Sequence, residues 1–328
     1  MDNAKVAVIA VVVLVVLASL GLALINFSGP DVKVGVAWRE GSPETLTDTC
    51  RSIEAAGGTC VMLGQVYCYG LEYDDRGRLV SGLEENGMLG PEAAETVKDG
   101  TWRASNAADV VGDLRAVVFS GGEDISPNLY ADPQAWVDTG EDVPSNPERD
   151  VSDYLTMSYC LDMDIPVLAI CRGMQMLSIV SGADMMQDIA MHFEDQGVPY
   201  DYEHRNPMPP SGYRDFAKHS VEVSQGTVLF SVYGKTLLEG CPSWHHQAVS
   251  SVEGTSLTVS AMSHAGGVPI IEGVERTDKT FAVGVQYHPE TAVSRGSGGQ
   301  DSGYMDYDDA IMIFKTIVQL ASLPLRTF

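Results

Sequence analysis

The sequence has few basic side chains. Lysine and arginine together number 20 against 45 aspartates and glutamates, which gives the 328-residue chain a formal net charge of −25. Because nothing in such a chain offsets repulsion by phosphates, its charge argues against nucleic acid as a partner. With 45% hydrophobic and 20% charged residues, the composition is that of an ordinary globular protein.

Cysteine is sparse and lacks metal-binding spacing. None of the six cysteines forms a CxxC pair, which argues against a zinc knuckle. If Cys171 is a free thiol, as argued below, five cysteines remain and at most two disulfides can form among them. Cysteine usage therefore does not settle the redox compartment.

No charged residue occurs between Lys5 and Asp31. This stretch contains the apolar run VAVIAVVVLVVLASLGLALINF, which is long enough to cross a bilayer of about 30 Å as a helix. It predicts a single-pass membrane anchor within residues 1–30, preceding the rest of the chain, with a weak preference for an external main domain. The alternative is a cleaved signal peptide and a secreted protein, because Gly21 and Ala23 could form a cleavage site.

Residues 31–328 have the pattern of one α/β domain. Strands are predicted over residues 32–38 and 60–63, with a helix from residue 42 to about 56 between them. This order predicts an open, mostly parallel, flavodoxin-like sheet flanked by helices. Residues 64–106 are glycine-rich, acidic and weakly periodic, and we interpret them as an insertion over one edge of the sheet.

The second half of the domain alternates apolar runs with polar turns. A strand and a glycine loop are expected over residues 115–125, and a helix over 148–164. An amphipathic helix is expected over 306–321. Further predicted strands are HSVEV, SLTVSAM, PIIEGVER and FAVGVQYH.

The stretch PVLAICRGMQMLS sets Cys171 between a short apolar strand and the start of a helix. A strand-to-helix turn thrusts its central side chain outward and leaves the first helical N–H groups unpaired beside it. This environment suits a nucleophilic thiol. The alternative is a buried core cysteine that acts as a small hydrophobic residue.

A cysteine nucleophile needs a base and a group that orients the base. FAVGVQYHPE offers His288 at the end of an apolar strand, with Glu290 two residues further on. SGGED, AICRGMQ and QYHPE each follow a predicted strand. Since the carboxyl ends of parallel strands meet at one edge of a sheet, these segments are expected to converge there.

Taken together, AICRGMQMLSIVSGADMMQDI, SGGEDISPNLY, NPERD, SWHHQAV and VQYHPE resemble the class I glutamine amidotransferase-like superfamily. The resemblance is to its γ-glutamyl-γ-aminobutyrate hydrolase branch, in the peptidase C26 family, and spans about residues 32–321. It implies a hydrolase that cleaves a γ-glutamyl amide through a thioester. Cys171 would be the nucleophile, His288 the general base and acid, and Glu290 the orienting carboxylate.

The oxyanion donors are expected to be the backbone N–H groups of Gly122 and Arg172. Glycine lets the backbone approach closely, and Arg172 directly follows the turn. The Arg172 side chain could alternatively form only a surface salt bridge. Asp124 and Arg149-Asp150 match family positions and are expected to brace loops by hydrogen bonds.

Gln175 lies one helical turn past Cys171, so the resemblance implies that its amide holds the glutamyl head group; a solvent-exposed glutamine is the alternative. His246 or Gln247 is expected to line the substrate side. We predict no metal site and no cofactor. A metal role for the pair His245 and His246 is not expected, because neighbours on an extended segment point in opposite directions.

Two departures from the family pattern are Ala183, where a second glycine is common, and Pro242, where an asparagine is usual. Both bear on substrate preference more than on activity. Two other functions remain open: a glutaminase that passes ammonia to a separate synthase, and a catalytically silent binding protein. The sequence settles neither the amine side of the substrate nor whether the chain forms a homo-oligomer.

Overall fold

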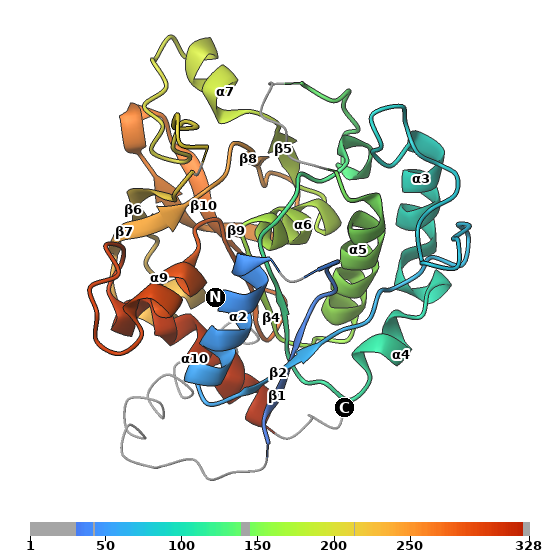
Figure 1. The fold of residues 1–328 in the computed structure, drawn as a ribbon, viewed down its shortest axis with the longest axis horizontal. Helices are drawn as coiled ribbons and strands as arrows, with labels where there is room; N and C mark the ends of the chain where they lie inside the picture. The colour runs from blue at the N-terminus through green and yellow to red at the C-terminus, as the bar shows by residue number, and fades with distance from the viewer. Residues whose placement is uncertain (1–30, 42, 139–144, 213, 324–328) are drawn as a thin grey trace.

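The computed structural model describes residues 31–41, 43–138, 145–212 and 214–323, and a nine-stranded sheet forms its centre (Figure 1). Its strands are β1 (Lys33–Val36), β2 (Thr59–Met62), β3 (Val117–Phe119), β4 (Val167–Ile170), β6 (Ala217–Val223), β7 (Leu237–Ser243), β9 (Leu257–Ser263), β10 (Ile270–Arg276) and β11 (Ala282–Val285). Two further strands, β5 (Asp184–Met186) and β8 (Ala248–Ser251), pair separately as an antiparallel ribbon.

The sheet has the order β2-β1-β3-β4-β11-β10-β9-β6-β7. Its first five strands are parallel and follow the flavodoxin order. The remaining strands pair antiparallel, so that β10 and β6 run against the other strands of the sheet. The predicted open, mostly parallel α/β sheet is therefore confirmed, with an antiparallel extension whose strand order the sequence did not predict.

Helices cover both faces of the sheet. Val167 and Ala169 of β4 pack into the core beneath α5 and α6, whereas Leu168 and Ile170 face the core beneath α2, α9 and α10. This alternation is the period of two expected for a strand buried on both faces. The helices are α2 (Glu44–Ala55), α3 (Pro91–Gly100), α4 (Ala107–Val111), α5 (Pro147–Asp162), α6 (Arg172–Val180), α7 (Ile189–Asp195), α8 (Val228–Tyr233), α9 (Pro289–Gly296) and α10 (Tyr307–Ser322).

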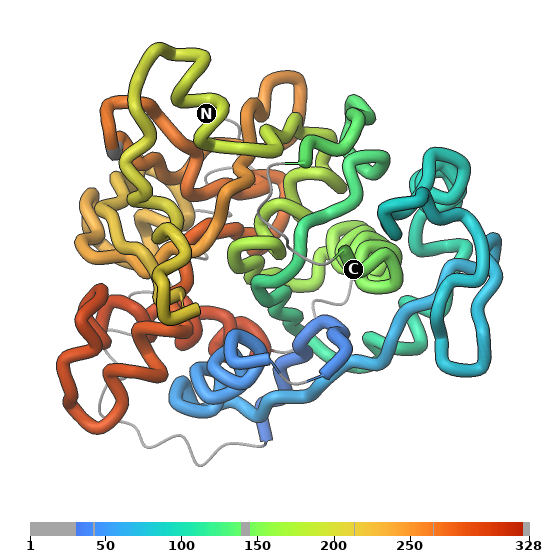
Figure 2. Tube along the Cα trace, turned by 45° about the horizontal axis from the view of Figure 1, so that its top comes forward, coloured from blue at the N-terminus to red at the C-terminus, as the bar shows by residue number. Residues whose placement is uncertain are grey.

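Residues 64–106 lie outside α5, on the side of the molecule away from β6 and β7 (Figures 1 and 2). The backbone N–H of Val66 donates to Ser152 Oγ at 2.9 Å, and that of Leu79 donates to Glu148 Oε1 at 2.8 Å. Leu89 and the α3 residues Ala94 and Val97 are fully buried. The segment is therefore an integral layer of the core.

The prediction of a membrane-anchored protein is corrected here. Within the part of the chain that the structure describes, no helix is long and apolar enough to span a bilayer. The segment on which both the anchor and the alternative signal peptide were predicted, residues 1–30, lies outside the described residues.

Cysteine pairing agrees with the limit set by the sequence. One disulfide joins Cys50 of α2 to Cys60 of β2. Cys171 is a free thiol, as expected for a nucleophile. The other free cysteines, Cys68, Cys160 and Cys241, are also buried.

Candidate active site

Cys171 occupies a strained turn between β4 and α6. Its backbone has φ 50° and ψ −108°, a left-handed conformation that is uncommon for a residue other than glycine. The turn is held from one side because the Cys171 N–H donates to Val285 O of β11 at 2.7 Å. Gly173 permits the tight packing that follows, since a Cβ there would lie 2.4 Å from Phe119 O. The predicted strand-to-helix turn is therefore present, and Cys171 is buried within it.

His288 and Glu290 lie at the adjacent strand end, where α9 follows β11. Nδ1 of His288 is 2.6 Å from Glu290 Oε1, and both side chains are buried. Burial opposes a charge on the ring, but Glu290 and Cys171 outweigh it and raise the pKa of His288 to about 10. The ring is thus an imidazolium at neutral pH, with Nε2 left available on its far side.

Gly121 separates Cys171 from His288. A Cβ placed on Gly121 would lie 2.7 Å from Cε1 of His288 and 3.4 Å from Cβ of Cys171. Only a residue without a side chain fits between them. The structure therefore brings the ends of β3, β4 and β11 together, as expected for the carboxyl ends of parallel strands.

The glycine loop is oriented by two arginines. Gly121 O accepts from Arg39 Nη1 at 3.0 Å and from Arg149 Nη2 at 3.1 Å. Because the peptide is trans and planar, the N–H of Gly122, one of the two expected oxyanion donors, points away from these arginines. The second expected donor, the N–H of Arg172, lies at the start of α6, where helical N–H groups have no partner within the helix.

The Arg172 side chain is not on the surface, so the alternative of a surface salt bridge was wrong. Its guanidinium is 1% exposed and pairs with Asp150 at 2.6 Å and with Asp153 of α5. Asp150 also accepts from the N–H and hydroxyl of Ser126. The expectation that Arg149 and Asp150 brace the loops is confirmed by these contacts.

His246 is held between two carboxylates. Its Nε2 is 2.9 Å from Asp124 Oδ2, and its Nδ1 is 3.5 Å from Asp188 Oδ2. Burial opposes the charged ring, but hydrogen bonds to both aspartates raise the pKa of His246 to about 9. Asp124 follows β3 and Asp188 precedes α7, so the His246 ring links the loops at these two positions.

Gln175 of α6 contacts Gln247, which follows β7. Gln175 is buried, and its Nε2 donates to the backbone O of Gln247 at 3.2 Å and lies 3.4 Å from Gln286 Oε1. The alternative of a solvent-exposed glutamine was wrong. The side-chain amide of Gln247 is 1% exposed, and neither its oxygen nor its nitrogen has a hydrogen-bond partner among the described residues. It is therefore a buried amide that a ligand could satisfy.

An aromatic residue that sequence reasoning missed covers His288. The ring of Phe216 packs edge-on against His288 with 5.0 Å between centroids, and against Trp244 with 5.1 Å. Pro242, a departure from the family pattern, supplies the carbonyl that accepts the His288 N–H at 2.8 Å. Cys171 and His288 are both buried, with exposed fractions of 5% and 2%.

A second polar cluster has the character of a metal site. His204, His219, His245 and Glu272 are buried and converge around one carboxylate oxygen. The sequence did contain a signal: His219 and Glu272 interrupt otherwise apolar strand faces. His245 and His246 do point to different partners, as predicted, but His245 meets residues from other strands, which its local sequence could not reveal.

Comparisons with known proteins agree with the motifs. A model of the family named peptidase C26 matches residues 100–290. Protein NtpR of Enterococcus hirae is 32% identical over 203 residues, which cover 61% of this chain and 76% of NtpR. The γ-glutamyl-γ-aminobutyrate hydrolase of Escherichia coli O157:H7 is 29% identical over 167 residues, covering 51% of this chain and 59% of that enzyme.

A solved structure agrees on the fold. A Thermoplasma acidophilum protein, provisionally described as part of a GMP synthase, matches with a TM-score of 0.50 at 14% identity. The match covers 90% of this chain and 96% of that protein. At this identity the likeness shows the fold alone.

Proposed function

Because the chain belongs to the peptidase C26 family of glutamine amidotransferase-like proteins, we propose that it hydrolyses γ-glutamyl amide bonds through Cys171, His288 and Glu290. The observation that carries the proposal is the convergence of a cysteine on a strained turn with a buried histidine-carboxylate pair. This arrangement has the parts that nucleophilic catalysis by a thiol requires.

In the proposed first step, the Cys171 sulfur attacks the γ-carbonyl carbon of the substrate. The C=O π electrons move to oxygen, and the backbone N–H groups of Gly122 and Arg172 stabilise the resulting oxyanion. His288, protonated before attack, donates its proton to the departing amine as the C–N bond breaks. The products are the free amine and a γ-glutamyl thioester on Cys171.

In the second step, water attacks the thioester carbonyl while His288 takes a proton from the water. The C–S bond then breaks, which releases glutamate and returns Cys171 and His288 to their starting state. Glu290 keeps Nδ1 of His288 protonated and directs Nε2 toward the reacting atoms, as the third member of a triad does.

Gln247 and His246 are the residues that we propose for the substrate side. The unpartnered amide of Gln247 can both donate to a carboxylate and accept from an ammonium, and the glutamyl head group carries both. His246 adds a positive charge beside it. Gln175 then acts indirectly, because its amide positions the Gln247 backbone.

A steady-state assay of the purified chain with γ-glutamyl-γ-aminobutyrate, glutamine and a γ-glutamyl dipeptide tests the proposal. We expect turnover without any added protein, and a higher kcat/KM for a substrate with an extended amine moiety than for glutamine. The matched control is Cys171→Ala, which should release no amine from any of the three.

The same assay separates this function from ammonia donation to a synthase. Negligible rates on all three substrates, followed by strong activation of glutamine hydrolysis by a co-purifying protein, would replace the hydrolase with a glutaminase that serves a synthase. Negligible rates under every condition, with Cys171 unreactive toward iodoacetamide, would favour a silent binding protein.

A further inference from the structure

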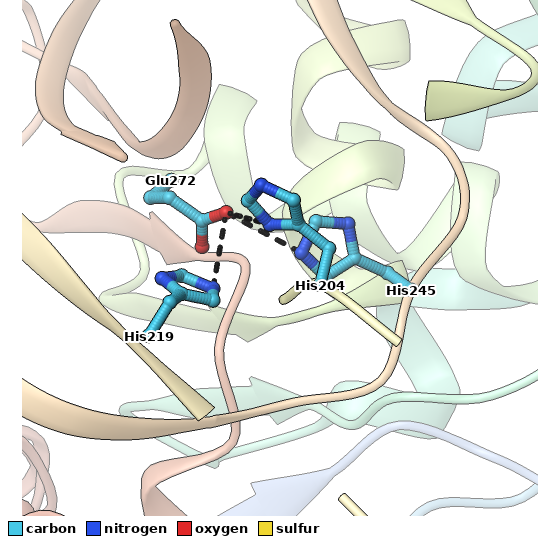
Figure 3. Close-up of side chains that lie close together, drawn as sticks. All are labelled: His204, His219, His245 and Glu272. Atoms are coloured by element: carbon cyan, nitrogen blue, oxygen red, sulfur yellow. Dashed lines mark ion pairs between the residues drawn. The ribbon is translucent and has the colours of Figure 1, made fainter. Parts of the chain in front are cut away.

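The cluster of His204, His219, His245 and Glu272 lies in the antiparallel half of the sheet, apart from the proposed triad. His219 is on β6, Glu272 is on β10, His245 follows β7, and His204 is in the loop between α7 and β6. Figure 3 shows the three imidazole rings surrounding the Glu272 carboxylate. One ligand atom from each residue can be chosen so that all four lie within 4.8 Å of one another.

The distances from the Glu272 carboxylate oxygen to the three nitrogens match those between neighbouring ligands of a single ion. Glu272 Oε1 lies 3.1 Å from His204 Nδ1, 3.5 Å from His219 Nε2 and 3.3 Å from His245 Nε2. Metal–ligand bonds of about 2.0 Å in a tetrahedron place neighbouring ligand atoms about 3.3 Å apart. The three nitrogens thus already stand at ligand spacing from the oxygen.

Hydrogen bonding does not account for the arrangement. His245 Nδ1 is 2.9 Å from the carbonyl of Gln247, and His219 Nδ1 is 3.2 Å from the carbonyl of Ser220. A carbonyl only accepts, so in the neutral rings Nδ1 carries the hydrogen and Nε2 presents a lone pair to the carboxylate. Such lone pairs and an anion repel one another unless a cation lies between them.

The polar atoms at the centre of the cluster are not satisfied by hydrogen bonds. Among the described residues, neither oxygen of Glu272 has a hydrogen-bond partner of acceptable geometry, and neither does Nε2 of His219 or of His245. Buried polar atoms are rarely left in this state.

We propose that His204, His219, His245 and Glu272 bind one divalent transition-metal ion, with zinc as the best fit. Three imidazole nitrogens and one carboxylate oxygen form a donor set that zinc accepts in tetrahedral geometry. The carbonyl partners of His219 and His245 are the outer contacts that fix the ring tautomer in metal sites. Four protein ligands and full burial indicate a structural ion.

The ion would stabilise the segment that carries the proposed substrate residues. The N–H of His245 donates to His204 O at 3.1 Å, and Gln247 O accepts from both His245 and Gln175. Glu272 is on β10, and Cys171 directly follows β4, two strands away in the sheet. The distance across two strands is on the order of 10 Å. A surface hollow lined by Glu203, Glu239, Lys218 and other residues reaches His219.

Metal analysis of the full chain tests the proposal without reference to catalysis. The chain would be produced in zinc-containing medium without a histidine tag, and its metal content measured by mass spectrometry. We expect about one zinc per chain, and X-ray absorption should show nitrogen and oxygen neighbours at about 2.0 Å with imidazole scattering and no sulfur. A sulfur neighbour would place the ion on a cysteine and overturn the proposal.

Variants assign the ligands. The metal would first be removed with dipicolinate, and zinc would then be titrated into Glu272→Gln and His219→Asn. We expect the zinc affinity of both variants to be at least about 100-fold below that of the unaltered chain. Loss of a residue that only contacts a metal ligand already lowers metal affinity by about 10- to 100-fold. The control is His264→Gln, because His264 is half-exposed and outside the cluster. Affinity equal to that of the control in both ligand variants would refute the assignment.

One measurement on the unaltered chain covers the case in which the variants fail to fold. Chelation should lower Tm, and zinc added back should restore it, because an ion that binds only the folded state stabilises that state. A chain that carries no transition metal, binds no added zinc and keeps its Tm in chelator would overturn the proposal.

Discussion

Gly121→Ala tests the geometry of the active site most directly. The new methyl group would lie 2.7 Å from Cε1 of His288, whereas carbon atoms in contact stay about 3.5 to 4.0 Å apart. The ring or the glycine loop must therefore move by about 1 Å. The backbone of Gly121 is not in the left-handed region, so the effect is steric rather than conformational.

Neither neighbour can move without loss of catalytic geometry. The His288 ring is fixed by Glu290 at 2.6 Å and packs against Phe216, and the Gly121 carbonyl is held by Arg39 and Arg149. A misplacement of about 1 Å at an active site can lower the rate by about 100-fold. Overpacking of a core costs about 1 to 3 kcal/mol of unfolding free energy. We therefore expect kcat/KM to fall by about 100-fold and Tm by a few degrees.

Two measurements check this prediction. Kinetics with a γ-glutamyl amide report turnover, and the rate of alkylation of Cys171 by iodoacetamide reports the pairing of Cys171 with His288 without a substrate. The matched control is Gly64→Ala, because no described atom lies within 4 Å of a Cβ at Gly64. If Gly121→Ala had the same kcat/KM and the same rate of Cys171 alkylation as Gly64→Ala, the reasoning that Gly121 separates the proposed nucleophile from its base would be refuted.

The remaining predictions concern single side chains of the site. Cys171→Ala should abolish turnover and shift Tm by no more than about 2 °C, since the replacement is small; activity in the pure variant would remove Cys171 from the mechanism. Glu290→Gln should retain partial activity and lower the pKa of His288, because the charge that stabilises the imidazolium is lost; an unchanged histidine titration by NMR would contradict this. The pKa of His246 is about 9 in the folded chain, against an ordinary value of 6.5. The charged ring therefore adds at most about 3 kcal/mol to the free energy of unfolding. This contribution is complete below pH 6.5 and is lost as the pH rises through 9. Urea unfolding should therefore show a weaker pH dependence between these values in His246→Gln, and equal slopes would speak against the charged ring. Gln247→Leu should raise KM without loss of stability, because it removes an unpartnered buried amide; a decrease above about 1 kcal/mol would mean that this amide has a structural role.

Much of the proposed site could be predicted because its parts are local. The apolar run before Cys171 ends at a turn, and the helix after it begins at once, so the sequence by itself places the thiol at a helix N-terminus. His288 and Glu290 are two residues apart across a proline, and their contact needs only that short connection. The parallel order of the strands then brings the two segments together, as expected for such a sheet.

The long-range contacts could not be predicted because no local pattern encodes them. Arg39 reaches Gly121 from a segment 82 residues away, and Phe216 covers His288 from the start of β6. The surface role considered for the Arg172 guanidinium was wrong because an arginine in a sequence does not reveal that Asp150 and Asp153 will be buried beside it.

The sequence alone therefore determined the class of fold, the family resemblance and the positions of the proposed nucleophile and the proposed base, since each depends on local sequence patterns. Only the tertiary structure decided which buried polar residues lie next to one another. His204, His219, His245 and Glu272 meet because β10, β9, β6 and β7 are ordered antiparallel at one end of the sheet. That order results from packing between strands that are distant in the sequence, so it cannot be predicted from the spacing of residues along the chain.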